Sequence, residues 1–360
     1  MFDFSDLKTI HIELTTNCQA KCPMCSRNIH SGIENPLLKI VGWTLEDFKT
    51  IINKEVLETV DRIYFCGNFG DPLLNDNLIE MCKYAKETSP KTAIGIHTNG
   101  SLRNAKWWTE LAQSLPQDHC VYFALDGLED THKLYRVGTD WNKIIENAKT
   151  FIEAGGRANW TYIKFKHNEH QVEECRKIAK EVGFQDFTVK NTSRFLVEPK
   201  YDVWDKNRIP IYSLEAPSDT ETHFLPKEVI DDYKSVLDEA EIDCHVQKIK
   251  EIYIDGFKTL LPCCWLAQTP MTFYDPTHIC EDVVDMLRNQ YNKMISDFGG
   301  IQNLDATKGI KNIISSDVWQ NIWKKKWNED KMLMCARTCG KFKTFDISQP
   351  QDQFIEREML

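Results

Sequence analysis

The sequence predicts an α/β fold, a partial (β/α)6 barrel of the TIM type followed by a smaller, cysteine-rich unit. Between residue 8 and about residue 190, six short β-rich runs alternate with longer helical patterns. Strands separated by helices imply right-handed crossovers and a parallel sheet. Six such units favour a barrel, or an open part of one, over a doubly wound sheet. After residue 240 the alternation is lost and six of the 13 cysteines follow.

The loops that follow the strands carry the most informative residues. The β-rich runs are "KTIHIEL", "RIYFC", "TAIGIHT", "CVYFAL", "NWTYIKF" and "DFTVK", and the helical candidates are 44–58, 76–88, 104–115, 140–154 and 169–182. The first four runs lead into "TTNCQAKC", "GNFGDP", "NG" and "DG". In parallel α/β folds the loops after the strands gather at one face, where active sites are built. We therefore expect these four loops to meet.

Composition shifts divide the chain into four predicted segments. Residues 1–195 form the barrel. Residues 196–239 form a connector or lid, because 196–226 interrupts the alternation and contains four prolines. Residues 240–345 form the cysteine-rich α+β domain, and 346–360 form a C-terminal tail. Within the third segment Trp319, Trp323 and Trp327 are spaced four apart on one helical face, which predicts core packing.

The overall composition is that of an ordinary soluble globular protein, with 42% hydrophobic and 27% charged residues. A net charge of −10 argues against a nucleic-acid surface. No run of eighteen apolar residues predicts a membrane span, and the N-terminus does not resemble a secretory signal. Thirteen cysteines without an export signal indicate reduced thiols and metal ligation in the cytoplasm.

Three cysteines lie close together in "NCQAKCPMCSR", at Cys18, Cys22 and Cys25. A structural zinc site would need a fourth ligand from elsewhere in the chain. A cubane iron–sulfur cluster held by three thiolates would leave one iron open to an exogenous chelate. The spacing by itself leaves zinc and iron–sulfur as equal alternatives.

The order of four motifs then carries a family resemblance. C-x3-C-x2-C after the first strand, "GNFGDP" after the second, "HTNG" after the third and "ALDG" after the fourth together resemble the radical S-adenosylmethionine (SAM) enzymes. The resemblance covers residues 8–190. It implies a [4Fe–4S] cluster whose open iron is chelated by the amino and carboxylate groups of SAM. An electron from the cluster would cleave SAM, and the resulting 5′-deoxyadenosyl radical would abstract a hydrogen atom from the substrate.

The resemblance also assigns residues. It implies that Cys18, Cys22 and Cys25 ligate the cluster and that Arg136 pairs with the SAM carboxylate. Met24 and Ala124 depart from the family pattern, where an aromatic residue and a serine are usual, and this weakens the assignment of Asp126. The glycines could instead be simple tight turns between strand and helix. The residues implied for SAM are Gly67, Gly70, Asp71 and Pro72 at the amino group, Asn99 and Gly100 at the ribose and adenine, and Asp126 at the ribose.

The late cysteines resemble a SPASM domain, or its shortened twitch form, which holds auxiliary iron–sulfur clusters. Six cysteines, Cys244, Cys263, Cys264, Cys280, Cys335 and Cys339, are too few for two fully ligated cubanes. The resemblance therefore implies one auxiliary [4Fe–4S] cluster, which would relay electrons. Its ligands would be Cys244, Cys263, Cys335 and Cys339. Cys263 and Cys264 could exchange roles, Cys280 has no assigned role, and a zinc ribbon is the alternative.

Cys264 carries a separate hypothesis. Some radical SAM epimerases use a cysteine thiol to return a hydrogen atom to the substrate, and an unligated Cys264 could be such a donor. The alternative is a buried cysteine that packs beside Trp265.

The polar faces of the strands suggest a substrate class. If they point into the barrel, Glu13, Lys164 and Lys190 line it, and a peptide or a small polar metabolite would fit. Epimerisation, dehydrogenation and cross-linking are the candidate outcomes.

The resemblance also implies partners. We expect a reductant such as flavodoxin or ferredoxin. Because the first strand begins near residue 8, we expect no separate peptide-recognition domain before it. A peptide substrate would then bind with the help of a separate recognition protein, or without one. The rival functions are a zinc-binding interaction protein and a non-catalytic iron–sulfur electron-transfer protein.

Overall fold

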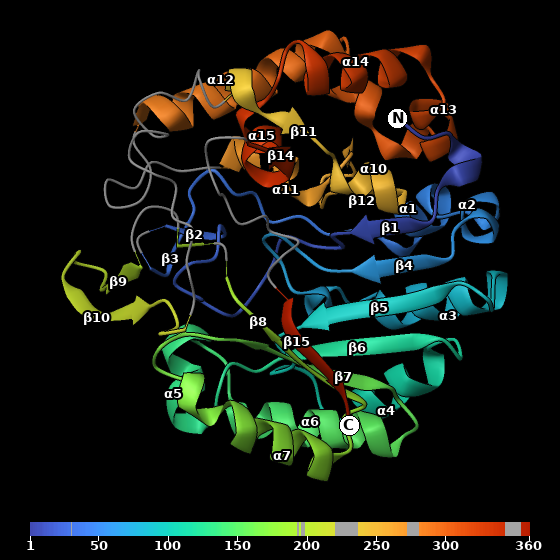
Figure 1. Ribbon diagram of the computed structural model, residues 1–360. Coiled ribbons are helices and arrows are strands. Elements are labelled where there is room, and N and C mark those ends of the chain that lie inside the picture. Colours follow the sequence, from blue (N-terminus) through green and yellow to red (C-terminus); the bar gives the residue numbers. More distant parts are fainter. Residues whose placement is uncertain (30, 193, 196–198, 220–236, 272–280, 343–353) are drawn as a thin grey trace.

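The computed structural model describes every residue except 30, 193, 196–198, 220–236, 272–280 and 343–353 (Figure 1). Its centre is a nine-stranded sheet in the order β13-β12-β1-β4-β5-β6-β7-β8-β15. Seven neighbouring strands, from β12 to β8, are parallel, while β13 and β15 pair antiparallel at the two ends. The strands are β1 (Thr9–Ile12), β4 (Arg62–Phe65), β5 (Ala93–Thr98), β6 (His119–Ala124), β7 (Ala158–Ile163), β8 (Asp186–Lys190), β12 (Glu251–Ile254), β13 (Leu260–Leu261) and β15 (Phe354–Met359).

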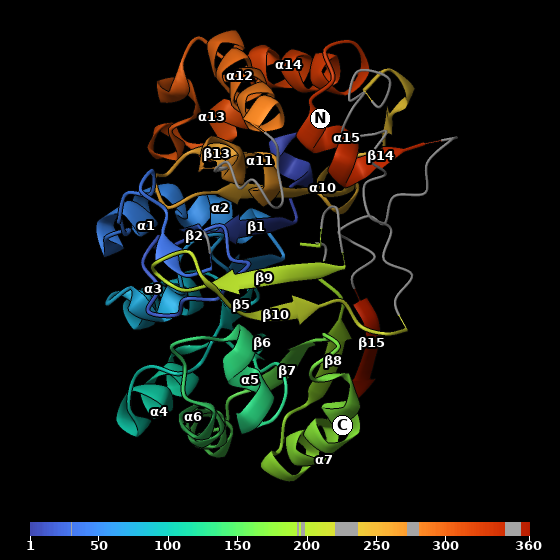
Figure 2. The ribbon, with the colours of Figure 1, turned by 90° about the vertical axis from the view of Figure 1, so that its left-hand side faces the viewer.

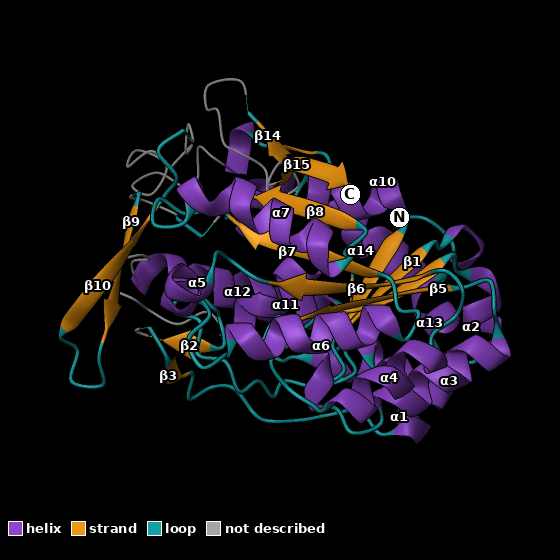
Figure 3. Ribbon diagram, turned by 90° about the horizontal axis from the view of Figure 1, so that it is seen from below, coloured by secondary structure: helices purple, strands orange, loops and turns teal. Residues whose placement is uncertain are grey.

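All six predicted barrel strands are present, and a partial barrel is confirmed. The helices between them pack against their neighbours in chain order, α1 on α3, α3 on α4, α4 on α6 and α6 on α7. They form a layer outside the sheet (Figure 3). The bounds are α1 (Leu45–Ile51), α2 (Lys54–Thr59), α3 (Leu78–Thr88), α4 (Ala105–Ser114), α5 (Glu129–Tyr135), α6 (Trp141–Glu153) and α7 (Val172–Val182), with the 3-10 turns η1 (Phe4–Asp6), η2 (Pro72–Leu74) and η3 (Glu169–Gln171).

Local capping explains where these helices begin and end. The helix expected at 44–58 is divided into α1 and α2, because the Asn53 side chain accepts from the amide of Val56 and starts a new helix. A reciprocal capping box between Thr44 and Asp47 starts α1. The end of α7 is set by Gly183 at φ +98°, a conformation that favours glycine.

The two faces of the sheet differ in polarity, as β1 illustrates. Ile10 and Ile12 are fully buried in the main hydrophobic core, whereas His11 and Glu13 point to the opposite, inner face. Because side chains alternate along a strand, this pattern places polar groups inside the barrel.

The C-terminal unit extends the barrel sheet. Strand β12 pairs in parallel with β1, so that Tyr253 lies opposite His11, and β15 from the predicted tail pairs with β8. The four-segment division itself stays a prediction. The unit contains β11 (Glu241–Ile242), α10 (His245–Ile249), α11 (Cys264–Gln268), η4 (Thr269–Met271), α12 (Glu281–Asp297), η5 (Ile301–Leu304), η6 (Ala306–Lys308), α13 (Ile310–Ile314), α14 (Asp317–Asn328), α15 (Leu333–Cys339) and β14 (Gly340–Lys341).

The Trp319, Trp323 and Trp327 stripe packs in the core, as predicted. Trp319 and Trp323 are fully buried and their rings meet edge to face at 5.5 Å. Phe298 contacts both rings. The stripe therefore holds α14 against the end of α12.

The predicted connector contains a β-hairpin, made of β9 (Lys200–Trp204) and β10 (Pro210–Glu215). It projects on the same side of the molecule as the short hairpin of β2 (Asn28–Ile29) and β3 (Ile33–Glu34), as Figures 1 and 2 show. Ser31 joins the two by donating to the carbonyl of Asp202 at 3.1 Å. Tyr201, Val203 and Leu214 pack with Cys22 and Met24 in a second hydrophobic cluster. The β9–β10 hairpin thus covers the cysteine loop.

Candidate functional site

A cavity of about 350 Å³ lies at the carboxyl ends of the barrel strands. It brings together the loops that follow β1, β4 and β5, three of the four loops that the sequence predicts to meet, whereas the "DG" turn after β6 does not line it. Three residues assigned to SAM, Pro72, Gly100 and Asp126, lie outside its wall. The predicted residues that line it are Cys18, Cys22, Cys25, Gly67, Gly70, Asp71, Asn99, Arg136 and Cys264.

The cysteine loop, residues 18–25, is held mainly by backbone contacts. The amide of Cys25 donates to the carbonyl of Cys22 at 3.1 Å, which forms a tight turn. Arg194 donates to the carbonyl of Met24 at 2.8 Å, and Tyr201 donates to the carbonyl of Pro23 at 3.1 Å. Because these bonds go to the backbone, the thiols are left to face the cavity.

The "GNFGDP" loop depends on close backbone packing. A Cβ at Gly70 would overlap the carbonyl of Thr15, and one at Gly67 would overlap the carbonyl of Gly70. The carboxylate of Glu13 accepts from the amides of Phe69 at 2.7 Å and Gly70 at 3.1 Å. These glycines are therefore required by close approach rather than by turn geometry alone.

Asp71 ties the loops after β4 and β5 together. Its carboxylate accepts from the Thr98 hydroxyl at 2.8 Å and from the amide of Asn99 at 2.8 Å, and the Asn99 side chain donates at 2.5 Å. It also accepts from the amide of Leu73 at 3.0 Å. Asp71 thus lines the cavity, while most of its hydrogen-bonding capacity stabilises the loops.

Asp126 and Arg136 form an ion pair at 2.6 Å. Asp126 is fully buried and also accepts from the amide of Ile163 at 2.7 Å, so it lies behind Arg136 and away from the cavity. Burial alone would lower the pKa of Arg136, but the Asp126 carboxylate raises it above the usual value. The guanidinium is therefore a fixed positive charge at the cavity wall.

The first cysteine set lines the cavity beside two cations, Arg136 and Arg194. Burial raises the pKa of Cys22 to about 11, while the nearby Arg136 and Arg194 act in the opposite direction. The two cations would offset the charge of bound thiolates. Among the described residues, no three His, Cys, Asp or Glu side chains form a group that could hold a metal ion as placed.

The second cysteine set also comes together in space. Cys335 and Cys339 lie one turn apart on α15, and Cys339 is hydrogen-bonded to the Cys244 thiol. Helix α15 packs against α11 and β11, and the amide of Asp243 donates to the carbonyl of Cys339 at 2.9 Å, so the segments that carry the four thiols meet. The twelve cysteines in the described part of the chain are all free thiols. Cys280 lies outside the described residues.

Neighbouring cysteines Cys263 and Cys264 face different surroundings. Cys263 precedes α11 and lies with Cys335 and Cys339. Cys264 is half-buried and lines the cavity together with Cys66. This geometry favours Cys263 over Cys264 as the member of the auxiliary set.

The inner wall opposite the cysteine loop is aromatic and polar. His11 stacks on Tyr64 at 4.4 Å, and His97 stacks on Tyr122 at 4.2 Å. Burial lowers the pKa of His11 to about 4 and that of His97 well below its usual value, so both imidazoles are neutral at pH 7. Lys190 lines the cavity as predicted.

Two expected lumen residues lie elsewhere. Lys164 forms an ion pair with Asp219 at 2.6 Å, and Thr161 and Ile163 take the inward positions on β7. The side of β7 expected to point into the barrel was therefore wrong. The ring of Tyr162 is fully buried against Phe187, on the side of the sheet away from the cavity. Glu13 supports the "GNFGDP" loop instead of lining the cavity.

The cavity is also lined by Asn68, Arg194 and Gln268, which were not among the predicted site residues. Asn68 stands inside the "GNFGDP" motif and could have been suspected from that place. Arg194 lies just after the sixth strand, where the loops of a parallel barrel converge. No local signal distinguishes Gln268.

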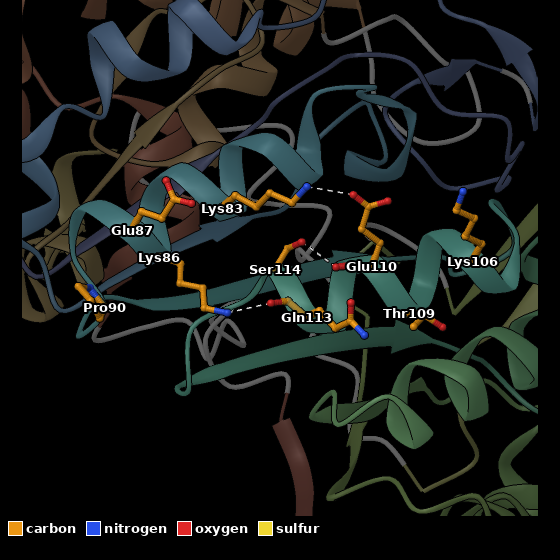
Figure 4. Close-up of a pocket in the computed structure, with 9 residues that line it drawn as sticks. All are labelled: Lys83, Lys86, Glu87, Pro90, Lys106, Thr109, Glu110, Gln113 and Ser114. Carbon is orange, nitrogen blue, oxygen red and sulfur yellow. Dashed lines mark hydrogen bonds and ion pairs between the residues drawn. The ribbon is translucent and has the colours of Figure 1, made fainter.

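A larger hollow, of about 920 Å³, lies between α3 and α4 on the outside of the barrel (Figure 4). Lys83 pairs there with Glu110 at 3.0 Å, and Lys86 donates to the carbonyl of Gln113 at 2.8 Å. These contacts are typical of a solvated helix surface, and the hollow is remote from the cysteine sets.

No helix in the described part of the chain has the length and apolar character needed to span a membrane.

Part of the chain is similar in sequence to a known protein. In sequence, 132 residues are 28% identical to the tungsten-containing aldehyde ferredoxin oxidoreductase cofactor-modifying protein of Pyrococcus furiosus. This match covers 37% of the chain and only 34% of that relative.

The chain also matches solved structures. A histidine-tagged anSMEcpe with bound AdoMet is 15% identical with a TM-score of 0.51, covering 96% of this chain and 90% of that one. Streptococcus suis SuiB is 18% identical with a TM-score of 0.49, covering 78% of this chain and 65% of that one. The model of the Radical SAM superfamily matches residues 12–179, which hold the cysteine loop, the "GNFGDP" loop and Arg136. Residues 12–179 therefore match a radical SAM domain.

Proposed function

We propose that this protein cleaves SAM reductively and abstracts a hydrogen atom from a peptide or a small polar metabolite. The observation that carries the proposal is the single cavity that joins Cys18, Cys22 and Cys25 to the "GNFGDP" loop and to Arg136. When bound by the three cysteines, a reduced [4Fe–4S] cluster would supply the electron for SAM cleavage.

The residues of this chain would bind and orient SAM. Arg136, fixed by Asp126, would pair with the SAM carboxylate, since a planar guanidinium suits that task. The carbonyls of the "GNFGDP" loop would accept from the SAM amino group, and Glu13 would hold that loop in place. Asn99 would border the ribose. Asp126 acts as the partner of Arg136, so we no longer assign it a ribose contact.

The auxiliary [4Fe–4S] cluster would be held by Cys244, Cys263, Cys335 and Cys339. Their proximity supports this ligand set, and they would place an electron carrier at the end of α11 that adjoins the cavity. A cytoplasmic location agrees with twelve described cysteines that are all free thiols. A flavodoxin or ferredoxin would supply the reducing electron.

The substrate is proposed as a peptide or a small polar molecule. The structure of native anSMEcpe, with a TM-score of 0.50 to this chain, holds AdoMet together with a Cp18Cys peptide. The Pyrococcus furiosus relative is named a cofactor-modifying protein, which keeps a small metabolite open. Neutral His11 and His97, with Tyr122 and Lys190, would provide the polar wall for either substrate.

Cys264 is our candidate hydrogen donor for an epimerisation. Its half-exposed position in the cavity supports this role over packing beside Trp265. In that reaction the Cys264 thiol would give a hydrogen atom to the substrate radical, and the thiyl radical left behind would be reduced by one electron from the reductant and would take up one proton from water. Cys66 faces the same cavity and offers a matched comparison.

The direct test uses protein purified and reconstituted anaerobically, then reduced and mixed with SAM. We expect iron and sulfide in equal amounts and the formation of 5′-deoxyadenosine, measured by liquid chromatography and mass spectrometry. Stoichiometric zinc without sulfide would establish the zinc-binding alternative. If the clusters are reduced normally but no 5′-deoxyadenosine forms, the protein is a non-catalytic electron-transfer protein.

The role of Cys264 is tested separately. The Cys264→Ala variant should still form 5′-deoxyadenosine yet lose epimerised product, whereas Cys66→Ala should keep both. Unchanged product from Cys264→Ala would exclude the hydrogen-donor role.

A further inference from the structure

Asn68 contacts Cys25 of the first cysteine set and Cys264, which directly follows Cys263 of the second set. It stands in the "GNFGDP" loop and lines the cavity. On one side, its backbone carbonyl accepts from Ser26 Oγ at 3.5 Å and lies 3.9 Å from Cys25 Sγ. On the other side, its Nδ2 donates to the carbonyl of Cys264 at 2.8 Å.

Two further bonds fix the Asn68 side chain. Its Nδ2 also lies 3.2 Å from Tyr253 Oη, and its Oδ1 accepts from Gln268 Nε2 at 2.9 Å. Asn68 therefore contacts α11 at its first residue, Cys264, and at its last, Gln268. The Tyr253 hydroxyl in turn donates to Glu13 at 2.8 Å, and Glu13 holds the loop amides. The loop and the C-terminal unit are joined through this network.

Helix α11 needs such outside support. It is only five residues long, and its N-cap residue, Cys263, makes no capping side-chain bond. An isolated helix of this length is unstable in water. The positions of Cys263 and Cys264 must therefore be set by contacts from elsewhere in the fold.

We propose that Asn68 is the positioning residue that fixes Cys264, and through it Cys263, against the SAM-binding loop. The proposal rests on the proposed function for its catalytic meaning, because it places the candidate donor thiol toward the substrate side of the cavity. Any movement of the "GNFGDP" loop when SAM binds would then be transmitted to α11.

The test compares two replacements of Asn68 in the full, anaerobically reconstituted chain. Asn68→Leu removes every side-chain bond at similar volume. Asn68→Asp removes the donors to Cys264 and Tyr253 but keeps an acceptor for Gln268. The matched control is Asn104→Ala, which removes the side-chain cap of α4, a helix outside the site.

The first readout is hydrogen–deuterium exchange of residues 264–268, which does not depend on SAM chemistry. We expect exchange at least tenfold faster in both Asn68 variants and unchanged in Asn104→Ala. Equal exchange in all three variants and the wild type would overturn the positioning role. This holds even if the wild type makes no 5′-deoxyadenosine, a result that would refute only the proposed function.

The second readout is coupling, the ratio of product to 5′-deoxyadenosine. We expect this ratio to fall at least tenfold in both Asn68 variants, because a displaced Cys264 no longer meets the substrate radical. The reduction potential of the auxiliary cluster should also shift, since its ligand Cys263 moves with Cys264. A coupling ratio and a potential that match the Asn104→Ala control would also overturn the proposal.

Discussion

The guanidinium of Arg136 is held at the cavity wall by Asp126, whose Oδ2 lies 2.6 Å from Arg136 Nε. Asp126 is fully buried, whereas Arg136 keeps 17% of its side chain exposed. The carboxylate thus faces the protein and the guanidinium faces the cavity. One residue of the pair supplies the charge, and the other determines where the charge lies.

Replacing Asp126 should therefore damage both stability and SAM binding. We expect Asp126→Asn to lower the free energy of unfolding by roughly 3 kcal/mol, because it leaves a largely buried guanidinium without its counter-charge. Urea unfolding measures this loss, and anaerobic calorimetry should show SAM affinity at least tenfold weaker. If SAM binds as tightly as to the wild type, Arg136 does not contact its carboxylate.

Gly70 should not tolerate a side chain. A methyl group there would overlap the carbonyl of Thr15, so Gly70→Ala should displace the loop and cost about 1–3 kcal/mol. Gly42 provides the control, because a Cβ there would lie 3.6 Å from Thr15 Oγ1, an ordinary contact. Thermal unfolding should separate the two variants, and SAM binding should be weakened only by Gly70→Ala. Equal melting temperatures would mean that the loop adapts freely.

Burial of Glu13 should make stability depend on pH. Burial raises the pKa of Glu13 from 4.5 to about 7, so the folded protein binds more protons than the unfolded chain between these values. The stabilisation contributed by protonated Glu13 is complete below pH 4.5 and is lost as the pH rises through 7. The total loss in the free energy of unfolding is about 3 kcal/mol. Glu13→Gln mimics the protonated form.

The comparison of the wild type with Glu13→Gln isolates this effect. Glu251 and Asp255, whose pKa values burial also raises to about 7, titrate in the same window and cancel in the difference. We expect equal stability at pH 5 and a more stable Glu13→Gln variant at pH 8, by urea unfolding. A difference that does not change with pH would show that Glu13 titrates normally.

Iron content should distinguish the two cysteine sets. We expect about eight iron atoms per chain in the wild type, and about four in both Cys18→Ala and Cys335→Ala. Of these two variants, only Cys335→Ala should still cleave SAM. Cys264→Ala should keep all the iron, because Cys264 lines the cavity and is not in the proposed ligand set. Loss of iron from Cys264→Ala would instead make Cys264 a ligand.

Local pattern was a good guide to the barrel. Alternation of β-rich and helical runs predicted the six central strands, because side-chain period and turn residues are encoded within a few positions. The same information located the cysteine loop and the "GNFGDP" loop at one face. The facing of β7 was misjudged, since Tyr162 is polar at one atom yet buried as a ring.

By itself, then, the sequence determined the order of the motifs, the spacing of Cys18, Cys22 and Cys25, and the strand ends that bring them together. Only the tertiary structure decided that Asp126 serves Arg136, that Asn68 joins Cys25 to Cys264, and that Cys264 rather than Cys263 lines the cavity. It also decided that β12 and β15 extend the barrel sheet. The physical reason is range: strands and turns follow from neighbouring residues, whereas partners such as Asn68 and Cys264, 196 positions apart, meet only after the chain has packed.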